Sequence, residues 1–123
     1  MGFTHYFIQQ RDFTPEEWEK IQMAANLTII QALAEGIELA GWNREGEPEV
    51  DENQISLNGL GEKGCETFKV ERIKPPKPEW DRGTPGDEYF NFCKTRERPY
   101  DRVVVTILHA ISKIAPGAMR ISS

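Results

Sequence analysis

The stretches CETFKV (residues 65–70) and FNFCKT (residues 90–95) decide the fold that this sequence predicts. Each mixes apolar and polar residues in near alternation, which is typical of a half-buried β-strand. Antiparallel pairing with Phe68 opposite Phe92 would bring aromatic side chains together across the two strands. A slip of one residue would turn one set of side chains to the wrong face, so we expect this register.

The same register places Glu66 opposite Lys94 at one rim of the sheet. Cys65 and Thr95 would lie beside this pair. A carboxylate and an ammonium at the edge of an apolar core can have shifted pKa values and act as a base and an electrostatic anchor. Structural ion pairs shift pKa values in the same way. The pair therefore marks a candidate site, and an ion pair that only caps the core is the alternative.

A helix is predicted to begin after Thr14, which fits an N-cap. Pro15 suits the first helical position, and Glu17 at the third completes a capping box. Phe13 and Trp18 stand at the positions of a hydrophobic staple. We expect this helix to end near residue 36 and to bury an apolar stripe made of Trp18, Ile21, Ala25, Ile29, Ala32 and Leu33.

A second helix is predicted from Pro99, with Asp101 in its first turn. Its apolar residues recur with the helical period at Tyr100, Val104, Ile107, Leu108, Ile111 and Ala115. Further strands are expected within residues 3–9, 37–42, 54–58 and 118–122. The order of elements predicts an α+β two-layer sandwich, in which two helices cover one face of an antiparallel or mixed sheet of four to six strands.

The 123 residues suffice for one domain, which we expect to span residues 1–123. Residues 74–88 are rich in proline and predict an exposed loop within it. No apolar run approaches the ~20 residues of a membrane span, and no secretory signal is evident. Two cysteines and two histidines lack the spacing of a zinc site, so we expect no metal, no cofactor and free thiols in a cytoplasmic protein.

Basic residues gather around the predicted start of the second helix: Lys94, Arg96, Arg98 and Arg102. Helix N-termini attract anions, and arginine adds paired donors, so a phosphate or carboxylate ligand is one interpretation. A solvated turn balanced by Glu97 and Asp101 is the other. Residues 1–68 hold 4 basic and 13 acidic groups, whereas residues 69–123 hold 11 and 7. The net charge of −5 argues against nucleic acid as the main partner.

Two further patterns are weaker. His5 lies on the first predicted strand, where a lone histidine is usually hydrogen-bonded and half-buried; a Cys–His nucleophile pair would need that strand beside residues 65–73. The glycines of residues 59–64 match G-x-G-x-x-G. Since a strand rather than a helix follows them, we expect a hairpin connection and not a dinucleotide site.

Five short motifs together resemble a group of small uncharacterised proteins from bacteria and their phages. They are Gly-x-Thr-His-Tyr (residues 2–6), Cys-Glu-Thr-Phe (65–68), Phe-Cys-Lys-Thr (92–95), Pro-Tyr-Asp (99–101) and Arg-Ile-Ser-Ser (120–123). The resemblance implies a stand-alone cytoplasmic protein and implies no activity.

Two hypotheses of function remain. The first is a binding or regulatory protein that docks a protein or a phosphate- or nucleotide-like anion near the strand ends. A phage-type protein is one version of this hypothesis; no membrane partner is expected, and a homodimer is left open. Its candidate binding residues are His5, Cys65, Glu66, Lys94, Thr95, Arg96, Arg98, Asp101 and Arg102. The second is a small enzyme on a phosphorylated or acyl substrate, acting through Glu66, Lys94 and Asp101 with His5 or Cys65.

Overall fold

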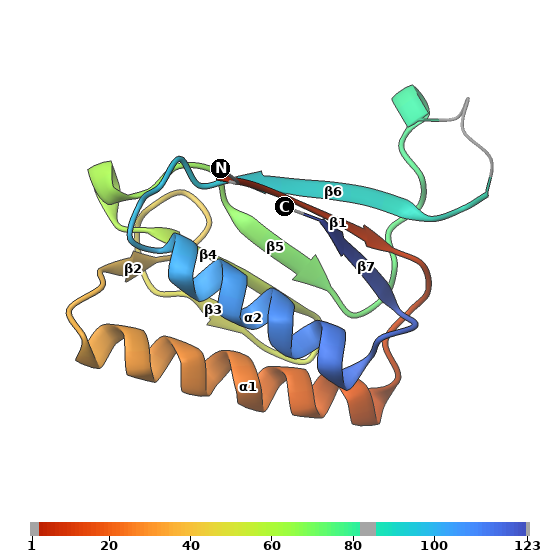
Figure 1. Ribbon diagram of the computed structural model, residues 1–123, viewed down its shortest axis with the longest axis horizontal. Coiled ribbons are helices and arrows are strands. Elements are labelled where there is room, and N and C mark those ends of the chain that lie inside the picture. Colours follow the sequence, from red (N-terminus) through yellow and green to blue (C-terminus); the bar gives the residue numbers. More distant parts are fainter. Residues whose placement is uncertain (1–2, 82–85, 123) are drawn as a thin grey trace.

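A computed structural model of the chain describes residues 3–81 and 86–122 (Figure 1). Gly2 and Ser123 of the motifs above, and residues 82–85 of the Pro-rich loop, lie outside the described residues. The main elements are β1 (Thr4–Gln9), α1 (Pro15–Ala34), β2 (Leu39–Ala40), β3 (Glu49–Val50), β4 (Gln54–Gly59), β5 (Phe68–Glu71), β6 (Tyr89–Lys94), α2 (Asp101–Ile114) and β7 (Met119–Ser122). Short 3-10 helices span Gly61–Lys63 and Glu79–Asp81.

The strands form two antiparallel sheets. One sheet has the order β6-β1-β7, and in the other β4 pairs with β2, β3 and β5. Both helices pack on the same side of this strand layer (Figure 1). The α+β class with two helices on one face is therefore confirmed, with two sheets of three and four strands where a single sheet was expected.

The first helix forms as its capping signals predict. Thr14 Oγ1 accepts the N–H of Glu17 at 3.1 Å, and the Glu17 carboxylate accepts the N–H of Thr14 at 2.9 Å. The rings of Phe13 and Trp18 lie 5.4 Å apart, as a hydrophobic staple requires. The predicted stripe is buried except for Leu33, which is 50% exposed because the second helix covers a narrower face than expected.

The second helix buries its whole predicted stripe. Val103 is buried with it, although the sequence pattern did not single this residue out. The two helices pack against each other, and their apolar faces close the core over Phe7 of β1 and Phe68 of β5. The rings of Phe7 and Phe68 lie 5.5 Å apart, so these two residues join the sheets from the helix side.

The expected pairing of residues 65–70 with residues 90–95 is wrong. Strand β5 pairs with β4, and β6 pairs with β1. Phe68 faces the core and is 0% exposed, whereas Phe92 lies on the opposite side of the layer and is 44% exposed. In a continuous ladder, opposed residues share a face. The predicted register would therefore expose one of the two rings of each pair, and no ladder forms there.

Two shorter corrections concern the approach to β5. The strand begins only at Phe68, because the chain bends at Glu66. The strand expected within residues 54–58 extends one residue further, because β4 runs through Gly59. A Cβ on Gly59 would lie 2.2 Å from the carbonyl oxygen of Lys63, so the glycine-rich segment is a closely packed connection.

Candidate functional site: the seam between the sheets

Residues 65–70 and 90–95 meet where β5 faces β6, although no β-ladder joins these two strands. This line of contact between the sheets is called the seam below. At one end, the N–H of Glu66 donates to the carbonyl oxygen of Lys94 at 3.2 Å. The N–H of Lys94 in turn donates to Glu66 Oε1 at 2.7 Å. Among the described residues no ion pair joins the two side chains. Glu66 and Lys94 do meet, then, but the carboxylate binds the backbone.

A thiol and a phenol lie beneath this contact. Cys93 Sγ donates to the carbonyl oxygen of Glu66 at 3.4 Å, and Tyr100 Oη donates to the same oxygen at 2.6 Å. Both residues are 0% exposed. Burial raises the pKa of the Cys93 thiol to about 12, and burial together with the nearby thiols raises the pKa of Tyr100. Because the thiolate is the nucleophilic form, Cys93 is inert at neutral pH.

His5 belongs to a second polar cluster. Its Nε2 lies 2.6 Å from Asp101 Oδ1, and the Thr95 hydroxyl donates to the same oxygen at 2.5 Å. His5 is 3% exposed and Thr95 is 0% exposed. The strand of His5 pairs with β6 and β7 and not with β5, so the strand adjacency that a pair of His5 with Cys65 would need is not formed; His5 lies opposite Cys93 instead. The cluster ties the first strand to the first turn of α2.

The connection from β6 to α2 is strained. Arg96 and Glu97 have φ values of 53° and 66°, in the left-handed region that non-glycine residues seldom adopt. The carbonyl oxygen of Phe3 accepts the N–H groups of Thr95 at 2.7 Å and Arg96 at 3.3 Å. These bonds and the Asp101 cluster hold the turn in place.

Of the basic residues predicted to gather before the second helix, Arg102 is the one that turns away. Arg102 turns to α1, where its guanidinium lies 2.7 Å from Glu35 Oε1. Arg96 and Arg98 are exposed on the strained connection. The Asp101 carboxylate already occupies the first turn of α2, which lessens the attraction of that helix end for a further anion.

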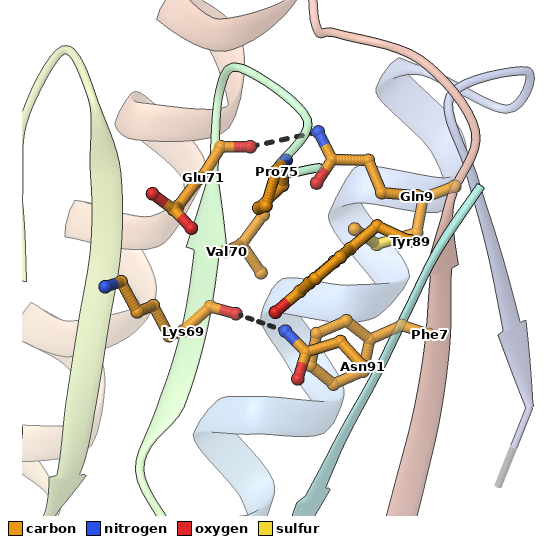
Figure 2. Close-up of a pocket in the computed structure, with 9 residues that line it drawn as sticks. Phe7, Gln9, Lys69, Val70, Glu71, Pro75, Tyr89 and Asn91 are labelled. Atoms are coloured by element: carbon orange, nitrogen blue, oxygen red, sulfur yellow. Dashed lines mark hydrogen bonds between the residues drawn. The ribbon is translucent and has the colours of Figure 1, made fainter. Parts of the chain in front are cut away.

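The other end of the seam holds a small cavity of about 110 Å³ (Figure 2). Gln9 Nε2 donates to the carbonyl oxygen of Glu71 at 3.0 Å, and Asn91 Nδ2 donates to that of Lys69 at 3.1 Å. Figure 2 shows both carboxamides reaching across to β5, with Tyr89 pointing into the space between. Side-chain amides thus satisfy carbonyl groups that a ladder would otherwise pair.

Sequence reasoning missed these two amides. Gln9 is 3% exposed, and its core-facing position follows from the alternation of β1, so a polar residue there was a usable signal. Asn91 faces inward beside Phe7. Neither residue could be assigned a partner without knowing that two sheets meet at this line.

The side of the β6-β1-β7 sheet opposite the helices carries an aromatic face, defined here by Tyr6, Ile8, Phe90, Phe92 and Trp80. The rings of Tyr6 and Phe90 lie 5.9 Å apart, and those of Phe90 and Phe92 lie 6.0 Å apart. Trp80 packs edge-on against Phe90 at 6.5 Å. Tyr6, Phe92 and Trp80 are 41%, 44% and 72% exposed. Aromatic rings gathered on an open face are typical of interaction surfaces.

The buried thiol predicts an alkaline loss of stability. The Cys93 pKa rises from 9.0 to about 12 on folding, so its stabilising contribution is complete below pH 9 and is lost between pH 9 and 12. We expect the free energy of unfolding to fall by at most about 1.4 kcal/mol per pH unit from this thiol. Urea unfolding at pH 7, 9 and 10.5 measures the fall. A Cys93→Ala variant with the same pH slope as the wild type would contradict this assignment.

No protein-family model, curated protein or solved structure matches this chain. The resemblance drawn from the five motifs therefore stays a prediction. Among the helices described, none combines the length and the apolar character that crossing a bilayer demands. Within residues 3–81 and 86–122, no group of three or more histidine, cysteine or acidic side chains is arranged to hold a metal ion.

Proposed function

We propose that this protein is a binding module that docks a segment of another protein on its aromatic face. The observation that carries the proposal is the exposure of Tyr6, Phe92 and Trp80 together on the side of the β6-β1-β7 sheet that faces away from α1 and α2. Aromatic residues dominate the energetics of protein interfaces because they bury a large area with few rotatable bonds. Two free cysteines fit a reducing compartment, and we place the protein in the cytoplasm as part of this proposal.

The charges around the aromatic face define the chemistry of the partner. Lys94 lies opposite Thr4 at one end of the outward row, and Arg96 and Arg98 follow it on the exposed connection. At the other end Arg120 is already paired with Glu88 at 3.7 Å. The basic end therefore fits an acidic residue of the partner, placed beside aromatic or aliphatic anchors that cover Tyr6 and Phe92. Under this proposal, the phosphate or carboxylate ligand expected from the sequence is a carboxylate side chain of the bound protein segment.

The groups suggested for catalysis support binding over chemistry. The Glu66 carboxylate accepts a backbone N–H, and Asp101 is bonded to His5 and Thr95. Cys65 is half-buried, and its backbone N–H donates to Asn58 Oδ1 at 3.0 Å. An enzyme needs such groups turned toward a shared cleft and within reach of a substrate. Here they bond to one another and to the backbone, so their arrangement favours a structural role.

The proposal is tested by selecting peptides from a random display library on the wild-type protein. We expect enriched peptides to combine an aromatic or aliphatic anchor with a neighbouring acidic residue. Their affinity should fall at least about thirtyfold in a Tyr6→Ser/Phe92→Ser variant, since the loss of even one hot-spot anchor costs about 2 kcal/mol. Replacing Met23, which is 68% exposed on α1, by serine is the matched control and should leave binding unchanged.

Three outcomes would overturn the proposal. In the first, the selected peptides bind the double variant as tightly as the wild type. In the second, the wild type binds a ten-nucleotide single-stranded oligothymidylate through these rings and selects no peptide. In the third, the aromatic face is buried in a stable homodimer, which sedimentation of the wild type and the double variant would reveal as a difference in mass.

A further inference from the structure

A second open surface lies on the other sheet, on the side of β3, β4 and β5 that faces away from the helices. A cavity of about 380 Å³ is lined there by Trp42, Glu49, Gln54, Ser56, Thr67 and Lys69. Small-ligand sites usually range from about 300 to 1,000 Å³. Lys69 also lines the seam cavity, where its carbonyl oxygen accepts the Asn91 amide, whereas none of the six residues belongs to the aromatic face.

Three adjacent strands supply the floor of this cavity. Glu49 on β3 lies opposite Ser56 on β4, and Ser56 lies opposite Lys69 on β5. The row thus presents a carboxylate, a hydroxyl and an ammonium in sequence on one face. Gln54 Nε2 donates to Glu49 Oε1 at 3.0 Å, which leaves the amide oxygen of Gln54 as an acceptor.

Ser56 is the residue that points to a ligand. It is 2% exposed, yet its hydroxyl has no hydrogen-bond partner within the described part of the chain. In the described part of the chain, every side-chain oxygen or nitrogen that is sealed from solvent has a hydrogen-bond partner. Because the Ser56 oxygen has none, it is not sealed, and it opens into the cavity that Ser56 lines. Buried hydroxyl groups in proteins normally have a hydrogen-bond partner, so a buried hydroxyl without one, at the floor of a cavity, points to a ligand that supplies the partner.

Trp42 forms one wall of the cavity. Its indole is 66% exposed, and its carbonyl oxygen accepts the hydroxyl of Thr67. Thr67 Oγ1 also accepts Asn58 Nδ2 at 3.3 Å. The backbone that carries the ring is therefore fixed to the residue just before β5, and the Trp42 side chain lines the cavity together with the polar groups.

We infer that this cavity binds one or two rings of a neutral carbohydrate. The pyranose ring has an apolar face that stacks on an indole and equatorial hydroxyls that both donate and accept hydrogen bonds. Glu49 and Gln54 supply acceptors, Lys69 supplies donors and Ser56 supplies both. Glu49 and Lys69 are exposed, so solvent and salt screen their charges and weaken the binding of an ionic ligand. Both side chains can still form strong, charge-assisted hydrogen bonds with hydroxyl groups.

The experiment titrates the wild-type protein with glucose, galactose, mannose, N-acetylglucosamine, maltose and cellobiose. The readout is the indole N–H signal of Trp42 in a ¹H–¹⁵N spectrum. We expect at least one sugar to shift this signal saturably, while the indole signal of Trp80 on the aromatic face stays in place. Trp42→Ala should weaken binding about tenfold, followed through the amide of Ser56. Ser56→Ala removes only an unpartnered hydroxyl, so it should fold normally and weaken binding about fivefold.

The inference is overturned if no sugar shifts the Trp42 signal at tens of millimolar. It is also overturned if Trp42→Ala and Ser56→Ala bind the sugar as tightly as the wild type, or if adenosine or guanosine shifts the signal and no sugar does. Peptide binding to the aromatic face uses other residues, so the two proposals succeed or fail separately. Trp80→Ala serves as the control, since it alters the aromatic face and leaves this cavity intact.

Discussion

Replacing Phe68 by alanine is expected to lower the free energy of unfolding by about 3–5 kcal/mol, the usual result of deleting a fully buried phenylalanine. Phe68 is 0% exposed and packs on Phe7, so the change removes the ring that joins the two sheets from the helix side. Phe92→Ala is the matched control. It deletes the same atoms from an exposed ring and should change stability by less than about 1 kcal/mol.

Urea unfolding of both variants measures the difference. A pair of phenylalanines facing each other across a ladder, as the sequence alone suggested, would give similar losses for the two substitutions. Equal losses would therefore contradict the assignment of Phe68 and Phe92 to opposite sides of the strand layer.

Asp101→Ala is expected to lower the free energy of unfolding by about 2–4 kcal/mol, because it removes the carboxylate that two buried polar groups share. The Thr95 hydroxyl keeps the carbonyl oxygen of Phe3 as a second acceptor at 3.2 Å. His5 and Thr95 both bond to Asp101 Oδ1, and both are almost fully buried. The carboxylate is 24% exposed, which allows water to replace part of what is lost. Asp101→Asn keeps an oxygen at this position and should lose less than half as much.

The comparison of these two variants separates a structural role from a catalytic one. If the Asp101 cluster holds β1 against the start of α2, stability follows the series wild type, asparagine, alanine. If both variants unfold at the same urea concentration as the wild type, the cluster contributes nothing to the fold and its arrangement would need another explanation.

The helices could be predicted closely because their signals are local. A capping box at Thr14, a staple between Phe13 and Trp18, and the 3.6-residue recurrence of apolar residues each depend on neighbours within about one turn. Leu33 was assigned to the buried stripe wrongly, because the width of the covered face is set by the partner helix.

The sheets could not be predicted as closely, because strand partners are non-local. The bounds of β1 and β6 follow from the alternation of apolar and polar residues, but neither segment's sequence indicates that the two strands pair with each other. For residues 65–70 the apolar pattern suggested β6 as a partner, whereas β4 offers Ile55 and Leu57 on the same face as Val70 and Phe68. Matching of faces across the strands decided the outcome.

The sequence predicted which residues of the candidate site lie near one another, but not the hydrogen bonds that join them. Glu66 and Lys94 meet as expected, but through a carboxylate-to-backbone bond. Asp101 and His5 also meet, although they come from opposite ends of the chain and no sequence spacing links them. Arg102 was misplaced because its partner, Glu35, lies on a helix whose packing angle the sequence does not specify.

The most direct test of the proposed function is a map of amide shift changes in a ¹H–¹⁵N spectrum as a selected peptide is added to the wild-type protein. The proposal predicts that the largest changes fall on Tyr6, Ile8, Phe90, Phe92 and Lys94, the outward row of β1 and β6. Changes centred on the helices, or on Glu66 and Asp101, would contradict it.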